Sequence, residues 1–181
     1  STTMPSLVIA PARIALALHR EDMWRFFSRA GFGAPPQLGF PGEAAGRLRP
    51  AASWRPVEQA TMAYGHGISV SLMQLARAYT IFARDGELVP VTLVKSPGHA
   101  AGTRVLSART ARAVRAMLEL AVQPGGTAPR ARIMGWRVAG KTGTAHKQEG
   151  GGYAPDKYIA SFVGLAPASD PARQRLEEPR V

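Results

Sequence analysis

Apolar residues recur at helical spacing in four stretches of the chain, and the first two lie near its start. The first is expected to begin near Pro11, because proline suits the opening turn of a helix, where its missing N–H has no partner to lose. The second is expected to end at Gly31 and Gly33. The apolar positions of these two helices are Ile14, Leu16 and Leu18, then Trp24, Phe26 and Phe27.

The third and fourth helices have clearer end signals. Ser69 or Ser71 is placed to cap the third, which Gly86 stops. Ser107 opens the fourth, which is broken by the Pro-Gly-Gly run at residues 124–126. We interpret the apolar stripe of the third helix as core packing, and the apolar residues of the fourth share one face. These stripes are Leu72, Leu75, Ala76, Tyr79, Phe82 and Ala83 in the third helix, and Val114, Met117, Leu118, Ala121 and Val122 in the fourth.

The remaining segments are extended or irregular. Residues 34–56 contain five prolines and several glycines, which favours an irregular surface segment, and a short extended piece is expected at residues 88–94. Apolar and polar side chains alternate in residues 136–145 and 158–165, which indicates two strands. A glycine-rich stretch separates these strands, so we expect an antiparallel hairpin with a long loop. Helices combined with such a hairpin predict an α+β fold.

Composition narrows the class of protein. At 181 residues with 45% apolar content, the chain is long enough for one domain with a sizeable core, or for part of a larger domain. No apolar run reaches the roughly 18 residues of a membrane span, so we expect any membrane anchor to lie outside this chain. The absence of cysteine excludes disulfides and thiolate metal sites, and the four histidines lack ligand spacing. Neither a metal nor another cofactor is predicted.

The formal net charge of +11 comes mostly from arginine, with 19 arginines against 4 lysines. A charge of this size favours contact with polyanions. The arginines are dispersed along the chain, however, without a dense run and without the interleaved aromatic residues of a nucleic-acid platform. We therefore predict no nucleic-acid partner, while a nonenzymatic basic binding module stays open as an alternative function.

The octapeptide at residues 138–145 fits two kinds of chemistry. The stretch Gly135–Thr142 satisfies the phosphate-loop pattern G-x-x-x-x-G-K-[ST], which would make the chain a nucleotide-binding module. Residues 141–143 are also the K-T-G element of penicillin-recognising serine enzymes. A phosphate loop needs a helix that starts at its Lys-Thr pair. The alternation of side chains instead runs through this stretch and is followed by glycines, so a strand is predicted, and the nucleotide-binding function is kept as an alternative.

Several stretches together resemble the transpeptidase domain of class B penicillin-binding proteins, the division type in particular. They occur in the family's order and spacing. The resemblance implies an α+β transpeptidase fold with helices packed on an antiparallel sheet, here incomplete, so that residues 1–181 would be a fragment of one transpeptidase domain with a divergent tail at 171–181. The matching stretches are GHGISVSLMQLARAY from Gly65, GGTA from Gly125, RVAGKTGTA from Arg137, GGGY from Gly150 and YIASFVGLAP from Tyr158.

The resemblance also implies a reaction. A serine would attack the D-alanyl-D-alanine end of a peptidoglycan stem peptide and pass the acyl group to an amine, and β-lactams would acylate the same serine. Lys141 would supply positive potential as the catalytic residue, Thr142 and Thr144 would bind the substrate carboxylate, and Gly143 would let the acyl group approach the backbone. The implied location is the periplasmic face of the bacterial inner membrane, with division-complex proteins as possible partners.

Three features depart from the family pattern. No serine is followed by lysine three residues later, so the S-x-x-K nucleophile is missing, and the extended Thr92–Lys95 segment does not replace it. The S-x-N position aligns with Ser6-Leu-Val8, where valine cannot hydrogen-bond an amide. Residues 172–181 are too polar for the apolar strand that the family places there. We therefore expect the chain to be inactive by itself.

Overall fold

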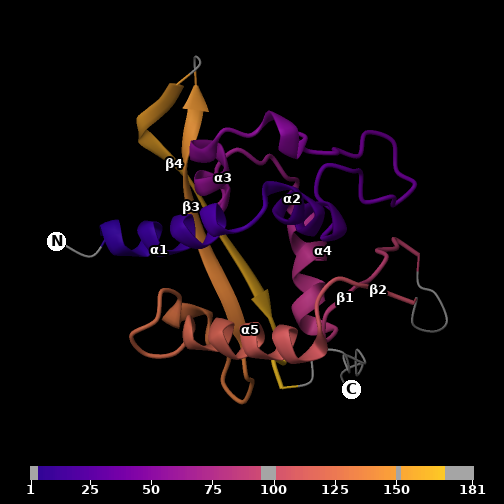
Figure 1. The fold of residues 1–181 in the computed structure, drawn as a ribbon. Coiled ribbons are helices and arrows are strands. Elements are labelled where there is room, and N and C mark those ends of the chain that lie inside the picture. The colour runs from indigo at the N-terminus through magenta and orange to yellow at the C-terminus, as the bar shows by residue number, and fades with distance from the viewer. Residues whose placement is uncertain (1–3, 95–100, 150–151, 170–181) are drawn as a thin grey trace. The chain divides into compact units, whose positions relative to one another are not determined.

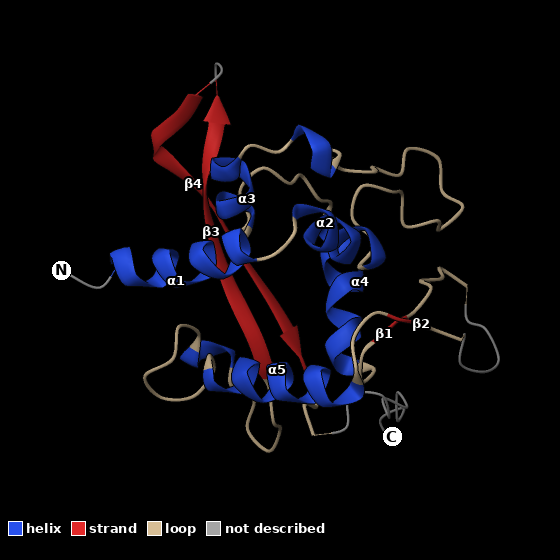
Figure 2. Ribbon diagram, viewed as in Figure 1, coloured by secondary structure: helices blue, strands red, loops and turns tan. Residues whose placement is uncertain are grey.

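The computed structural model describes residues 4–94, 101–149 and 152–169 (Figure 1). Two compact units are formed: unit 1 comprises residues 1–78 and 88–105, and unit 2 comprises residues 79–87 and 106–181. None of the helices in the described part is long and apolar enough to cross a membrane. In chain order the elements in Figure 2 are α1 (Met4–Ala17), α2 (Arg20–Arg29), η1 (Ala51–Ser53), α3 (Pro56–Met62), α4 (Leu72–Ala83), β1 (Glu87–Leu88), β2 (Thr103–Arg104), α5 (Ala108–Leu120), η2 (Pro129–Ala131), β3 (Ala139–Glu149) and β4 (Gly152–Leu165).

The core of unit 1 draws one residue from each of its first three α-helices. Ala15 of α1, Met23 of α2 and Met62 of α3 pack with Trp54, and all four side chains are buried. The Trp54 indole N–H donates to the Arg49 carbonyl oxygen at 3.0 Å, which satisfies the one polar group that this ring takes into the core. The core therefore combines apolar burial with a paired indole.

Gln59 ties α3 to the end of α1. Its side chain is buried, and its amide nitrogen donates to the carbonyl oxygens of Ala15 at 2.7 Å and Leu18 at 2.8 Å. The last carbonyl groups of a helix have no intrahelical partner, so they need donors from elsewhere. Gln59 supplies these donors, and the end of α1 is thereby fixed against α3.

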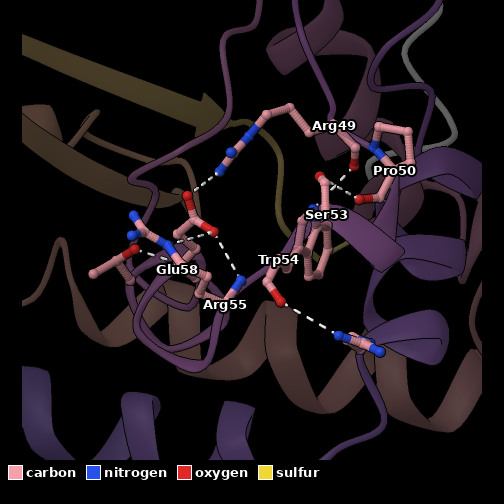
Figure 3. A network of polar contacts seen from close by, with 8 residues as sticks. Arg49, Pro50, Ser53, Trp54, Arg55 and Glu58 are labelled. Carbon is pink, nitrogen blue, oxygen red and sulfur yellow. Dashed lines mark hydrogen bonds and ion pairs between the residues drawn. The ribbon is translucent and has the colours of Figure 1, made fainter.

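The N-terminus of α3 is organised by Glu58 (Figure 3). Pro56 is the first helical residue, and the Glu58 carboxylate reaches back to accept from the Arg55 backbone N–H at 2.7 Å. Its other oxygen accepts from the Arg49 guanidinium at 2.8 Å. The backbone hydrogen bond first, and then the arginine, lower the pKa of Glu58 from 4.5 to about 2. Glu58 is therefore held in its charged form.

Gln74 holds an irregular segment of unit 1 against the start of α4. Its side chain is 2% exposed, and its amide nitrogen donates to the carbonyl oxygens of Ala34 and Ala45, both at 2.8 Å. Its amide oxygen accepts from the Ser71 N–H at 2.8 Å, while the Ser71 hydroxyl oxygen accepts from the Gln74 N–H at 3.1 Å. One buried side chain thus orders a helix cap and two loop positions.

Unit 2 is built around the hairpin of β3 and β4. The strands are antiparallel, and the pairing runs from Ala139 opposite Leu165 to Glu149 opposite Gly152, with a register shift between His146 and Gln148. Helix α5 packs against β3. The buried apolar residues of this unit include Ile81, Ala111, Val122, Val138, Ala139 and Ala168.

Two arginines of α5 join that helix to the end of α4 within unit 2. Arg112 and Arg115 both bind the Asp85 carboxylate, at 2.5 and 3.1 Å. Hydrogen bonds from Arg112 and then Arg115 lower the pKa of Asp85. Arg115 also donates to the Phe82 carbonyl oxygen at 2.7 Å, which satisfies an orphan group at the C-terminal end of α4.

Much of the predicted element pattern is confirmed. Helices occupy all four expected regions, and β3 and β4 form the expected antiparallel hairpin. Ser71 caps α4, and the Ser107 hydroxyl oxygen caps α5 by accepting from the Thr110 N–H at 3.1 Å. The mixed α+β fold is confirmed as well, with helix α5 on the hairpin.

One prediction about helices was wrong, and one helix was not predicted. Pro11 lies inside α1, which already begins at Met4, so the helix accepts the loss of one backbone hydrogen bond there. The seven-residue α3 was not predicted, because it lies at the end of the proline-rich segment. Its start depends on the carboxylate of Glu58, a contact that apolar spacing does not reveal.

The exposure of some apolar helix residues and the bounds of the hairpin strands also differ from the sequence predictions. Leu72 is 81% exposed, so it does not belong to the core as expected, and Met117 on the apolar face of α5 is 64% exposed. Trp136 lies before β3, in a turn that its N–H closes by donating to the Ile133 carbonyl oxygen at 3.1 Å. The expected long hairpin loop is also wrong, because pairing continues to Glu149 opposite Gly152.

Replacement of Gln74 tests the ordering of the irregular segment. We expect Gln74→Leu to lower the free energy of unfolding by about 2 to 4 kcal/mol, because it removes the part-buried hydrogen bonds to two carbonyl groups and one N–H. Urea denaturation followed by circular dichroism measures this loss. Gln123→Leu is the matched control, since Gln123 is exposed, and an equal effect of both variants would contradict the assigned role.

The lowered pKa of Glu58 predicts a pH-dependent contribution to stability. Because the folded-state pKa lies below the ordinary value of 4.5, this contribution is fully present above pH 4.5 and is lost as pH falls toward about 2. Glu58→Gln should therefore be less stable than the unaltered chain at pH 7, and the difference should shrink between pH 4.5 and 2. Urea titrations across this range measure it, and a difference that stayed constant would contradict the prediction.

Candidate active site

The K-T-G element lies on extended backbone. Residues 141–144 fall within β3, which continues without interruption to Glu149. The prediction of a strand through this motif is confirmed. A phosphate loop would need a helix to start at Thr142, and β3 occupies that position, so the backbone that the nucleotide-binding alternative requires is not formed.

Alternation along β3 divides the motif between two faces. Thr142 and Thr144 share one face, and Lys141 and Gly143 share the other. Lys141 is exposed, and its ammonium group donates to the Thr142 carbonyl oxygen at 2.5 Å. The positive charge thus stays beside the strand backbone and is open to solvent.

One edge of β3 has no strand paired with it in the described part of the chain. Within the described residues β3 pairs with β4 alone, so its other edge presents unpaired N–H and C=O groups. An extended peptide can add to such an edge through main-chain hydrogen bonds. Lys141, Thr142, Gly143 and Thr144 thus place two hydroxyl groups and one ammonium group along a stretch of extended backbone.

Phe162 of β4 sets the backbone of β3 just before the motif. A Cβ placed on Gly140 would lie 2.5 Å from the Phe162 ring and 2.9 Å from the Val163 carbonyl oxygen. A Cβ on Gly164 would also meet this ring, at 2.9 Å. The ring therefore covers two glycines that face each other across the hairpin, and neither position has room for a side chain.

Thr127 is a site neighbour that sequence reasoning did not select. The Thr142 hydroxyl donates to the Thr127 hydroxyl oxygen at 3.2 Å. The loop that carries Thr127 is anchored next to it, because the Ala128 N–H donates to the Ala121 carbonyl oxygen at 2.8 Å. A Cβ on Gly126 would lie 2.3 Å from that same oxygen, so glycine is required for this close approach. The G-G-T-A match was the available signal, but it does not show which residue Thr127 meets.

Other candidate groups lie elsewhere or do not form a site. Ser6 belongs to unit 1, whereas the K-T-G element belongs to unit 2, so the geometry given above is that of unit 2 alone. In the part of the chain that the structure describes, no three His, Asp or Glu side chains are grouped to hold a metal ion. The motif chemistry thus rests on hydroxyl groups, backbone and one ammonium group.

A family model for the penicillin binding protein transpeptidase domain matches residues 3–173. The chain therefore belongs to the family of penicillin-binding protein transpeptidase domains. The match covers every motif on which the sequence resemblance was based, the K-T-G residues included.

Curated relatives agree with this family. The chain is 43% identical over 163 residues to the probable peptidoglycan D,D-transpeptidase PenA of Neisseria meningitidis, covering 90% of this chain and 28% of that protein. It is 36% identical over 163 residues to the peptidoglycan D,D-transpeptidase FtsI of Escherichia coli, again covering 90% of this chain and 28% of the relative. The chain thus spans under a third of the length of these relatives.

Solved structures share the fold. The apo transpeptidase domain of Burkholderia pseudomallei penicillin-binding protein 3 matches with a TM-score of 0.84 and 56% identity, over 88% of this chain and 49% of that one. Penicillin-binding protein 3 of Mycobacterium tuberculosis, complexed with aztreonam, matches with a TM-score of 0.77 and 33% identity, over 82% of this chain and 37% of that one.

A methyl group at Gly140 tests the hairpin that supports the motif. Gly140→Ala should lower the free energy of unfolding by about 1 to 3 kcal/mol, because the new Cβ has no room beneath the Phe162 ring. Thermal unfolding measures the effect, and Phe162→Leu added to Gly140→Ala should recover part of it. Gly143→Ala is the matched control, since its Cβ would meet only the movable Ser161 hydroxyl, at 2.8 Å. An equal loss in both glycine variants would contradict the packing argument.

Proposed function

We propose that this chain is part of a division-type penicillin-binding D,D-transpeptidase domain that cross-links peptidoglycan. In this reaction a serine attacks the D-alanyl-D-alanine end of a stem peptide, D-alanine leaves, and an amine of a second peptide takes the acyl group. Residues 1–181 form one part of a single domain, with residues 171–181 as a divergent tail. The observation that carries this proposal is the extended K-T-G backbone on a strand edge that is open to a peptide.

The edge of β3 aligns the substrate backbone, and the face that carries Thr142 and Thr144 binds its carboxylate. The stem peptide lies antiparallel to β3 and forms main-chain hydrogen bonds, and the hydroxyl groups of Thr142 and Thr144 bind its terminal carboxylate. The Thr142–Thr127 contact supports this role, because it restricts where the Thr142 hydroxyl points. The backbone N–H of Thr144 serves as one of two oxyanion donors, and Gly143 leaves room for the acyl group.

Lys141 supplies the positive charge of the site. Its ammonium group lies beside the strand backbone and is exposed, so it raises the local potential where a carboxylate and an ionising nucleophile meet. β-Lactams enter the same site and acylate the serine. The aztreonam complex of the Mycobacterium tuberculosis relative supports this choice of ligand.

Activity requires a nucleophile from outside the K-T-G unit. This sequence has no S-x-x-K, and the S-x-N position reads Ser6-Leu-Val8, so we propose that the chain by itself performs no acyl transfer. Similarity to FtsI supports a place in cell division, at the periplasmic face of the inner membrane, among division-complex proteins. The nucleotide-binding alternative would need a helix at Thr142, where β3 runs instead.

A hybrid domain tests the proposal. Residues 106–169 of this chain would replace the matching segment of the Burkholderia pseudomallei transpeptidase domain, which is 56% identical. Labelled penicillin should form a covalent band with this hybrid on a denaturing gel, whereas chain 1–181 alone should show none. Lys141→Ala in the hybrid should slow acylation about 100-fold or more, because charge stabilisation is lost.

The control for the hybrid is Arg109→Ala, which removes an exposed positive charge from α5 at a distance along the chain from the motif. This variant should acylate at the rate of the unaltered hybrid. Acylation that is unchanged by Lys141→Ala would contradict the assigned role of the lysine. A covalent band with chain 1–181 would show that it contains a nucleophile after all.

A further inference from the structure

Unit 2 contains a pocket of about 680 Å³ that the proposed transpeptidase chemistry does not use. Its lining comes from Val122 and Gln123, just after α5, and from residues 129–138, and no residue of the K-T-G element contributes to it. The turn before β3 forms one wall. This turn is closed by the hydrogen bond from Trp136 to Ile133, with Gly135 at a φ of 79°.

The turn exposes apolar side chains that a solvated surface does not require. Met134 is 98% exposed, Trp136 is 53% exposed and Ile133 is 51% exposed, and all three line the pocket. Clustered exposed apolar residues mark a surface that another molecule covers. Trp136 is especially suited to this role, because tryptophan dominates the energetics of many interfaces.

The charges around the pocket are positive. Arg132 lines it, Arg130 lies on the adjoining η2, and both are exposed and form no ion pair with any described residue. Arg137 also lines the pocket, but Glu119 holds its guanidinium through contacts of 2.9 to 3.1 Å. Two guanidinium groups thus stay available for carboxylates beside an apolar hollow.

We propose that this pocket binds an acidic peptide segment that carries an apolar anchor residue. Its carboxylates pair with Arg132 and Arg130, and its apolar side chain packs against Met134 and Trp136. A nucleic acid fits less well, because the lining holds a single aromatic ring and several aliphatic side chains, whereas strand binding uses successive stacking rings. This binding uses no residue of the K-T-G element.

The pocket adjoins the loop that holds Thr127. Val122 and Gln123 precede that loop, Pro129 follows it, and all three line the pocket. A bound peptide therefore contacts both ends of the loop whose hydroxyl group meets Thr142. The site is placed where a partner can brace the substrate-recognition strand without covering it.

Fluorescence anisotropy with chain 1–181 tests the proposal. The probe is a fluorescein-labelled hexapeptide of sequence EELLEE, and the same peptide with lysine in place of glutamate is its control. Arg132→Glu should weaken binding of the acidic probe about tenfold or more, as expected for a lost charge-assisted pair. Arg109→Glu, which makes the same charge change on exposed α5, should weaken it less than about threefold.

Methionine oxidation locates the bound probe. Saturating EELLEE should slow peroxide oxidation of Met134 about fivefold or more, because the peptide excludes solvent from it, and should leave Met117, which is 64% exposed on α5, unchanged. The proposal is overturned if the lysine peptide binds equally well, if Arg109→Glu matches Arg132→Glu, or if Met134 is not protected. It is likewise overturned if a labelled single-stranded oligonucleotide displaces the probe and protects Met134 more strongly.

Discussion

The candidate site depends on the register of one antiparallel strand pair. Thr142 lies opposite Phe162 and Lys141 opposite Val163, so the faces that carry the hydroxyl groups and the ammonium group are set by β4. A slip of one residue would exchange these faces. The Phe162 ring opposes such a slip, because it fits over Gly140 and would clash with any residue that has a side chain there. Phe162 has no reactive group, but its packing determines which faces of β3 carry the Thr142 hydroxyl and the Lys141 ammonium group.

In unit 1, side-chain hydrogen bonds order a segment that lacks regular secondary structure. Its loops are joined by an isolated bridge between Arg47 and Ser69, and other backbone groups that leave water need partners as well, because buried groups without them are costly. Gln74 donates to Ala34 and Ala45, and Gln59 donates to the end of α1. Both glutamines are buried and each makes more than one hydrogen bond, so they act as cross-links between helices and loops.

Local signals in the sequence were sufficient for the strand that carries Thr142 and for the cap at Ser107, because both depend on neighbouring residues. The contact between Thr142 and Thr127 was not predictable, since it spans 15 residues and depends on how the intervening loop folds. Gln74 was missed for a related reason: a polar residue within an apolar stripe is normally assigned to the surface. Leu72 was expected in the core, yet periodicity alone does not tell which face of α4 is covered.

The excess of arginine over lysine has a structural explanation in part. Arg115 binds both Asp85 and the Phe82 carbonyl oxygen, and its side chain is only 13% exposed. Arg20 and Arg77 donate to backbone carbonyl oxygens in unit 1. Lysine would serve poorly in these places, because the guanidinium group offers five donors in a fixed plane and can serve a carboxylate and a carbonyl together. A net charge of +11 therefore overstates the attraction to polyanions, and the arginines without acidic partners, such as Arg132, give a better measure of it.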